Sequence, residues 1–500
     1  MADTRSGVRR IAPLTGGVVR PPGGEFVLAE QEGSSDADRL REPFEAAHVV
    51  VERPSFDAEQ VSGLVGVHVI LDVHTQYGKR GRIFPLSVKA WRWCRMRKSY
   101  VFRLYPTTPQ QARLAAMLAS HCELYNAALE ERREAWARRR ITIKSAAQMA
   151  QLTEIRDARP DQAVWSFTSQ QQTLRRLDKA FQSFFRRVKA GEKPGYPRFR
   201  SVRRFDSVDF RHGDGIKYQT KGWSKGHAGL RIQGVGVVKV RQHRPLPDGA
   251  KLGQITVKRE GYGPRARWHI VIPIEVEPNP LPETGREIGV DLGVVHFATT
   301  SEVIPGVTDE CGHIANPRHL AASADRLAVA QRAYARTQRG SNRRRKAGQR
   351  IGVLRAKVRR QRADHAHKTA RALIASADLI AVEDLRIANM VRRPKPRPDS
   401  NGGHLPNGAA AKSGLNRSIL DAGWGVFTSV LAAKAEEAGR LLLLVNPANT
   451  SRTCPQCGHC DAGNRQSQAA FACLACGFTA NADRVGAINV LRAGTARRAK

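Results

Sequence analysis

Three acidic residues in this sequence stand where buried secondary structure is expected to end or begin. Asp291 and Glu383 each close an apolar run, at 288–291 and 379–383, so each is predicted at the end of a buried strand. Asp483 precedes a helical run at 485–491. A carboxylate at such a position is costly to bury unless it is paired or holds a metal ion. Three converging carboxylates would supply the hard oxygen ligands that Mg²⁺ or Mn²⁺ prefers.

The chemistry expected of such a centre is two-metal hydrolysis of a phosphodiester. One ion activates water and the other stabilises the leaving oxygen, with the two ions about 4 Å apart. This reaction requires no protein nucleophile. Each acid alone is a weak signal, because a single carboxylate at a strand end usually caps a turn or forms an ion pair. For Asp384, next to Glu383, that capping or ion-pairing role is our prediction.

Four of the eight cysteines form two close pairs near the C-terminus. The two C-x2-C pairs are separated by fifteen residues, and each is followed by a glycine that permits a tight turn. This spacing predicts a four-thiolate zinc site, although free thiols or disulfides are alternatives. A site closed by four sulfurs is structural, and His459 and Cys460 are interpreted as bystanders. The predicted zinc ligands are Cys454, Cys457, Cys473 and Cys476.

The formal net charge of +38 indicates a polyanionic partner, whose binding would depend steeply on salt. Residues 331–371 hold fifteen Lys or Arg and one acid, Asp364, and residues 340–342 are predicted to form a turn between two helices. Such charge density repels itself unless phosphate neutralises it. In the alternative interpretation, the excess charge belongs to an ordinary solvated surface, and residues 331–371 form a solvated helical hairpin that binds no phosphate.

The chain alternates between helical and strand-like patterns. Residues 100–105 predict a strand, and Thr108, Pro109 and Gln111 predict the N-cap, first turn and third position of the helix that follows. Residues 200–280 predict an antiparallel barrel or sandwich. A second amphipathic helix is predicted at 169–189. Its apolar side is expected to be core rather than a base-stacking surface, and comprises Leu174, Leu177, Phe181, Phe184 and Phe185.

These segments resemble the TnpB family of OrfB-type transposon proteins and the related compact type V CRISPR effector nucleases. The resemblance covers about residues 98–492 and extends beyond the three acids. It includes residues 100–106 (Tyr-Val-Phe-Arg-Leu-Tyr-Pro), 195–199 (Gly-Tyr-Pro-Arg-Phe), 415–424 (Leu-Asn-Arg-Ser-Ile-Leu-Asp-Ala-Gly-Trp) and 449–454 (Asn-Thr-Ser-Arg-Thr-Cys). One position departs from the pattern: many relatives have Asn two residues after the third acid, where this chain has Val485.

The resemblance implies a mixed multidomain fold. It comprises a β-barrel of the oligonucleotide-binding type with a helical insertion, followed by an RNase H-like (RuvC) α/β nuclease domain with an inserted zinc ribbon. The expected boundaries are 1–95 for a partly disordered N-terminal extension, 96–106 with 200–282 for the barrel, 107–199 for the helical recognition domain, 283–452 with 479–500 for the nuclease, and 453–478 for the ribbon.

The resemblance also implies a function. The expected protein is an RNA-guided DNA endonuclease that binds a guide RNA, recognises a short flanking DNA motif and cleaves complementary DNA. Asp291, Glu383 and Asp483 would be its catalytic metal ligands, for Mg²⁺ or Mn²⁺, and the basic hairpin would lie against the guide–target duplex. Val485 keeps open the alternative of an RNA-guided DNA-binding protein with weak or no cleavage. A strand-joining transposase is disfavoured, because no tyrosine motif for it is present.

The expected location is the cytoplasm, with association to the bacterial nucleoid when DNA is bound. No stretch approaches the roughly 18 apolar residues that span a bilayer, and no export signal is recognised at the N-terminus. Paired cysteines close together in sequence suit a metal in a reducing compartment.

Overall fold

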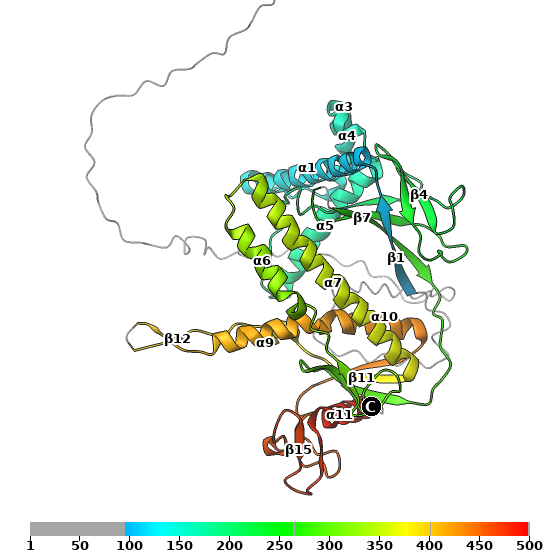
Figure 1. Cartoon of the computed structure of the whole chain (residues 1–500). Coiled ribbons are helices and arrows are strands. Elements are labelled where there is room, and N and C mark those ends of the chain that lie inside the picture. Colours follow the sequence, from blue (N-terminus) through cyan, green and yellow to red (C-terminus); the bar gives the residue numbers. More distant parts are fainter. Residues whose placement is uncertain (1–95, 264–265, 401, 499–500) are drawn as a thin grey trace, which may run out of the picture. The chain divides into compact units, whose positions relative to one another are not determined.

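Two sheets organise the part of the chain that the computed structural model describes, namely residues 96–263, 266–400 and 402–498 (Figure 1). The N-terminal extension predicted at 1–95 lies outside the described residues. Among the described helices, none combines the length and the apolar composition that crossing a bilayer requires.

The first sheet has seven antiparallel strands in the order β2-β6-β7-β1-β5-β4-β3. An isolated bridge between His212 and Ile216 connects the ends of its two edge strands, so the sheet is barrel-like, as the alternating pattern predicted. Alternate residues, such as Phe102 and Leu104, point into one apolar core. The strands are β1 (Met96–Tyr105), β2 (Ser207–Arg211), β3 (Ile216–Gln219), β4 (His227–Ile232), β5 (Gly236–Arg241), β6 (Gln254–Glu260) and β7 (Arg267–Val276).

Five helices are inserted between β1 and β2: α1 (Thr108–Arg139), α2 (Ser145–Ala150), α3 (Leu152–Ala158), α4 (Pro160–Ala163) and α5 (Phe167–Lys189). The N-cap of α1 is Thr107, so the prediction of Thr108 was wrong by one residue. The side-chain oxygen of Gln110 accepts a hydrogen bond from the Thr107 backbone N–H at 3.0 Å. This capping interaction places Gln110, rather than Gln111, at the third position of the helix.

The apolar face predicted for α5 is buried only in part. Leu174, Leu177 and Phe181 are buried, whereas Phe184 is half-buried and Phe185 is 58% exposed. Every residue from 182 to 189 is half-buried or exposed, so the apolar stripe continues past the end of the core. The prediction that Phe185 belongs to the core was therefore wrong.

The second sheet has the strand order β10-β9-β8-β11-β14. Its first three strands pair antiparallel, and β8-β11-β14 pair parallel. The strands are β8 (Glu287–Asp291), β9 (His296–Thr300), β10 (His313–Ala315), β11 (Leu379–Glu383) and β14 (Leu441–Val445). The helices of this half are a 3₁₀ turn (Ala321–Ser323), α6 (Ala324–Ala335), α7 (Asn342–Ser376), α8 (Ile387–Met390), α9 (Ala409–Ala422), α10 (Trp424–Ala438) and α11 (Ala482–Arg498).

Helices cover both faces of this sheet. Ile380 and Val382 of β11 belong to one core with α7 and α10, whereas Leu379 and Ala381 belong to a second core with Val490 of α11. A strand that is buried on both faces must be apolar along its whole length. This explains why the runs that precede the two strand-end acids show no alternation.

Helix α11 lies directly on strand β8 because glycine forms part of the contact. A Cβ atom on Gly289 would stand 2.0 Å from the carbonyl oxygen of Ala487 and 2.8 Å from the backbone nitrogen of Leu491. Any side chain at position 289 would therefore push the helix away from the strand.

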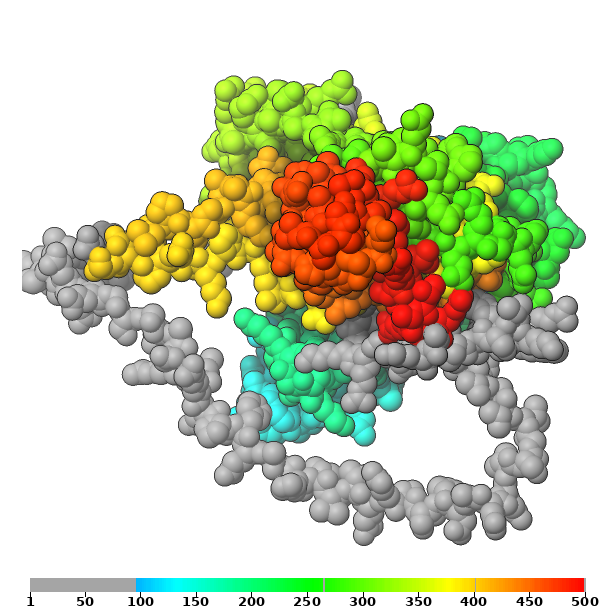
Figure 2. All heavy atoms as spheres, turned by 90° about the horizontal axis from the view of Figure 1, so that it is seen from below, coloured from blue at the N-terminus to red at the C-terminus, as the bar shows by residue number. Residues whose placement is uncertain are grey.

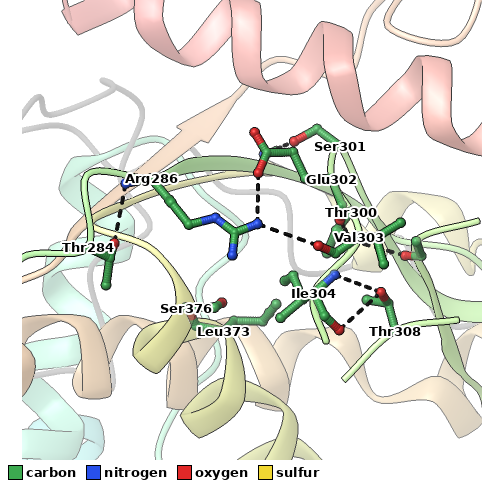
Figure 3. A network of polar contacts seen from close by, with 12 residues as sticks. Thr284, Arg286, Thr300, Ser301, Glu302, Val303, Ile304, Thr308, Leu373 and Ser376 are labelled. Atoms are coloured by element: carbon green, nitrogen blue, oxygen red, sulfur yellow. Dashed lines mark hydrogen bonds and ion pairs between the residues drawn. The ribbon is translucent and has the colours of Figure 1, made fainter. Parts of the chain in front are cut away.

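A polar network fixes the start of β8 and the loop that follows β9 (Figure 3). The guanidinium of Arg286 donates hydrogen bonds to Glu302 at 2.9 Å and to the Val303 carbonyl at 3.4 Å. Farther along the loop, the Thr308 hydroxyl accepts a hydrogen bond from the Ile304 N–H at 2.9 Å. These contacts hold the two strands together outside the apolar core.

Helices α6 and α7 form the basic hairpin that the sequence predicted. Ser341 caps α7, accepting a hydrogen bond from the Arg344 N–H at 3.1 Å. Four of the fifteen basic residues in 331–371 form ion pairs, which leaves eleven without an acidic partner within 4.0 Å among the described residues. The paired residues are Arg359 and Arg360 with Glu260, Arg362 with Asp421, and Lys368 with Asp364.

Replacing Gly289 by Ala is expected to lower the free energy of unfolding by about 1–3 kcal/mol, because the new methyl group overlaps the α11 backbone. Urea unfolding of the purified chain measures the change. Gly253→Ala is the matched control, since no atom lies within 4 Å of its added Cβ. Equal stability of the two variants would contradict the close strand–helix contact.

Candidate active site and metal centre

Two of the three predicted acids lie at neighbouring strand ends. Asp291 is the last residue of β8 and Glu383 is the last residue of β11. These strands are parallel, and Val290 is paired to Val382. Asp291 and Glu383 are the next residue on each strand, so they lie at the same level of the sheet. The two carboxyl groups act on each other: Glu383 raises the pKa of Asp291, whereas Asp291 opposes the rise in the pKa of Glu383 that burial causes.

The third predicted acid comes from the helix that lies on β8. Asp483 stands in the first turn of α11, where its N–H and that of Arg484 are capped by the Asn481 side chain at 3.0 and 3.2 Å. A Cβ atom on Gly486, one turn further along, would lie 2.9 Å from a carboxylate oxygen of Asp291. The absence of a side chain at 486 therefore leaves space for Asp291 beside the helix.

Ionisation of Asp291 and Glu383 is unfavourable in the absence of a cation. Desolvation raises the pKa of Asp291 well above its ordinary value, and the negative charges of Glu383 and Asp483 raise it further. Burial also raises the pKa of Glu383, which is 8% exposed. Like charges held in a poorly solvated site disfavour ionisation in this way.

Two further side chains, which the sequence analysis did not identify, partly offset this repulsion. The hydroxyl of Thr450 donates a hydrogen bond to Glu383 at 2.9 Å. The guanidinium of Arg465 donates one to Asp483 at 3.1 Å, and its charge lowers the pKa of both Asp291 and Glu383. Thr450 lies in the 449–454 motif, so the resemblance drew attention to its segment although not to its contact with Glu383. Arg465 lies in a loop between the two cysteine pairs, and no motif marks its position.

The four predicted cysteines meet in one cluster, in which all sulfur atoms lie within 4.8 Å of one another. The Cys454 and Cys476 sulfurs are 3.6 Å apart, as are those of Cys457 and Cys473. The glycine that follows each pair adopts a positive φ, 79° at Gly458 and 71° at Gly477, and its N–H bonds to the carbonyl of the first cysteine at 3.0 Å. The four sulfur atoms are therefore close enough together to act as ligands of one metal ion.

This ribbon, with its short strands β15 (Ala470–Ala472) and β16 (Thr479–Asn481), is attached to α11 by a small core of its own. Figure 2 shows the ribbon in orange next to α11 in red. Val485 is fully buried in that core with Cys454, Cys473 and Phe471. The amide of Asn489 donates to the carbonyls of Thr450 and Thr453, both at 2.7 Å, and ties the ribbon's first segment to the helix.

A second group of potential metal ligands lies in the loop before β10, where donor atoms of Asp309, Cys311 and His313 lie within 4.8 Å of one another. No motif in the sequence predicted this group. The Asp309 carboxylate already accepts hydrogen bonds from the backbone N–H groups of Cys311 and His313, at 3.0 and 2.8 Å. These bonds close a turn, which accounts for the acid.

Comparison with known families supports the motif analysis. The OrfB/IS605 family, described as "Probable transposase", matches residues 271–393, and its helix-turn-helix domain matches residues 96–140. The Cas12f1-like TNB domain matches residues 424–490, a range that contains the four-cysteine ribbon.

Individual relatives match over most of the chain. It is 30% identical over 403 residues to InsQ of Escherichia coli (strain K12), covering 80% of this chain and 92% of InsQ. It is 29% identical over 407 residues to a protein of Streptomyces pristinaespiralis, covering 80% of this chain and 90% of that protein. Both relatives carry the name "Putative RNA-guided DNA endonuclease".

A solved Cas12f1–sgRNA–target DNA complex contains a chain of similar fold. The TM-score is 0.50 at 12% identity, covering 79% of this chain and 98% of the other. Fold, motifs and overall identity agree, and the chain belongs to the OrfB/IS605 (TnpB) family, which is related to the compact type V CRISPR effectors.

Proposed function

We propose that this protein is an RNA-guided DNA endonuclease that binds a guide RNA, recognises a short flanking DNA motif and cleaves complementary DNA. The observation that carries the proposal is the approach of Asp291 and Glu383 at the ends of two parallel strands, with Asp483 as a further negative neighbour. The names of the relatives support the choice of nucleic acids. A charge of +38 suits both partners.

Asp291, Glu383 and Asp483 are assigned as ligands of Mg²⁺ or Mn²⁺. Divalent ions would supply the activation of water and the stabilisation of the leaving oxygen. The residues fit this role because their carboxylates repel one another in a desolvated site, and a cation removes that repulsion. Thr450 orients Glu383 by its hydrogen bond, and Arg465 places a positive charge beside Asp483.

Zinc is the metal we assign to the four cysteines. A tetrahedral ion with Zn–S bonds of about 2.3 Å requires sulfur atoms about 3.8 Å apart. Separations of 3.6 Å for two sulfur pairs match this requirement closely. Four sulfurs leave no open coordination position, so the ion would stabilise the ribbon without taking part in cleavage.

The two sheets support the domain assignment that we propose. The order β10-β9-β8-β11-β14, with a three-stranded antiparallel meander followed by two parallel strands, supports an RNase H-like (RuvC) nuclease at 283–452 with 479–500, interrupted by the ribbon at 453–478. The barrel-like sheet supports an oligonucleotide-binding-type domain at 96–106 with 200–282, and its inserted helices, at 107–199, form the recognition domain. The unpaired basic residues of the α6–α7 hairpin are assigned to the phosphates of the guide–target duplex.

The alternative, a guided binder that cuts poorly, rested on Val485. That side chain is fully buried in the ribbon core and packs beside Cys454 and Cys473. Packing in the ribbon core accounts for an apolar residue at this position, and Asp483 keeps its place in the first turn of the same helix. The nuclease is therefore the function that the site supports best.

Asp291→Ala is expected to reduce the rate of cleavage of matched DNA by more than about 100-fold. Loss of a side chain that only orients a metal ligand typically costs about 10- to 100-fold, and loss of the ligand itself should cost more. Binding of guide RNA and DNA should persist. The assay uses the full chain with its co-purifying RNA in Mg²⁺. Asp384→Ala is the control, since this neighbouring acid is exposed, and it should cleave normally. Full activity of Asp291→Ala would refute the assignment.

Asp291→Asn is expected to stabilise the metal-free fold by about 0.5–2 kcal/mol at pH 7. The raised pKa of Asp291 means that the folded state holds the proton more tightly than the unfolded state. Wild-type stability is therefore lost as pH rises from the ordinary carboxyl pKa through the raised value. Urea unfolding without added Mg²⁺ should show the gain near pH 7 and none near pH 4. A gain that is the same at both pH values would contradict the electrostatic cause.

The purified chain is expected to carry one zinc ion, measured by atomic absorption, and Cys457→Ser should lose it. Loss of zinc should also lower the thermal midpoint, because structural metal binding contributes directly to folding. Cys460→Ser is the control, since this exposed cysteine lies outside the cluster. Retention of zinc by Cys457→Ser would exclude the four-thiolate site.

A further inference from the structure

The exposed end of α5 and the segment that follows it carry three aromatic rings that remain largely exposed to solvent. Phe185 is 58% exposed, Phe199 47% and Tyr196 43%. Tyr196 is held edge-on by Phe181 and Phe184, with ring centroids 5.6 and 5.3 Å away. Phe185 stacks edge-on against Phe184 at 5.2 Å. The rings therefore support one another in a fixed arrangement while keeping much of their surface in water.

The segment that carries Tyr196 and Phe199 is anchored to α1. Asn126 donates a side-chain hydrogen bond to the Arg200 carbonyl at 2.8 Å and accepts one from the Arg200 N–H at 2.9 Å. Pro197 is buried between the two exposed rings. The segment thus has a defined position before any ligand arrives, which lowers the entropic cost of binding.

A hollow with a volume of about 340 Å³ is lined by Arg133 of α1 and by residues 194–199. The Arg133 guanidinium lies over the Phe199 ring, 5.2 Å from its centroid. Residues 186–204 contain eight Lys or Arg and a single acid, Glu192. A suitable occupant must present a flat apolar face and must also carry negative charge nearby. A nucleotide with an unstacked base has both properties.

We propose that this hollow, the 133/194–199 site, binds an unpaired nucleobase of the guide RNA by stacking on Tyr196 or Phe199. This inference rests on the proposed function and deepens it. The target DNA strand pairs with the guide, so its bases are stacked within a duplex, and the displaced strand becomes single-stranded only once the DNA is unwound. A structured guide RNA, by contrast, keeps unpaired bases in its loops and bulges, where proteins recognise them by stacking. Base stacking would give the 195–199 motif a function, which the chemistry of the nuclease centre does not provide.

The test measures binding of a labelled single-stranded oligouridine of about 16 nucleotides to the full-length chain, by fluorescence anisotropy. Phe199→Leu keeps an apolar side chain but removes the ring, and it is expected to weaken binding by about 5- to 100-fold. The slope of log affinity against log salt, between about 50 and 200 mM, should not change, because no phosphate contact is lost. Phe199→Trp restores a ring and should restore affinity.

Arg198→Gln is the matched charge variant on the same segment, and it should reduce the salt slope by about 0.7. A fully paired RNA duplex of equal length should bind the wild-type chain and both position-199 variants equally well, since it offers no free base. Thermal unfolding should show that Phe199→Leu retains the wild-type midpoint, as expected for a residue that is 47% exposed.

Three results would overturn the proposal: unchanged affinity of Phe199→Leu for oligouridine, an equal loss for the paired duplex, or a loss confined to oligodeoxythymidine, which would assign the site to DNA. The assay needs neither Mg²⁺ nor cleavage, so its outcome is independent of the nuclease assignment. The same Phe199→Leu effect is expected in an Asp291→Ala background, which separates failure at the stacking site from failure at the catalytic centre.

Discussion

The structure of the C-terminal half depends on holding three like charges together in a poorly solvated place. Glu383 is almost fully buried, and its charge and that of Asp483 raise the pKa of Asp291. A flexible scaffold would relieve this repulsion by moving the carboxylates apart. The parallel pairing of β8 with β11 prevents that separation for two of the acids, and the tight contact of α11 on Gly289 prevents it for the third.

The ribbon gives the chain a second means of controlling this centre. Thr450 precedes the first cysteine pair, Arg465 lies between the two pairs, and Asp483 follows the second. Thr450 contacts Glu383, Arg465 contacts Asp483, and the charge of Asp483 acts on Asp291, although all three residues are distant from β8 and β11 in sequence. The ribbon and the residues that flank it therefore bring a hydroxyl, a guanidinium and a carboxylate together.

The sequence predicted those parts of the site that local pattern determines. Apolar runs with terminal acids located β8 and β11, and the cysteine spacing located the ribbon, because both depend on residues close in sequence. The contact of Gly486 with Asp291 and the reach of Arg465 depend on tertiary packing, so no local pattern reveals them. Phe185 illustrates the opposite error: its helical spacing is that of a core residue, yet within the part of the chain that the structure describes no element covers the end of α5.

The charge distribution presents a problem that the proposed metal ions resolve. Eleven basic residues of the α6–α7 segment have no acidic partner among the described residues and would attract a phosphate backbone, whereas the three carboxylates would repel it at the proposed cleavage site. Arg465 supplies one positive charge among the three acids, which is insufficient to reverse their sign. Two divalent cations would supply four positive charges and invert the local potential. Affinity for the polyanion and access of its phosphate to the centre are therefore separate properties: the first belongs to the basic surface, and the second arises only when cations are bound.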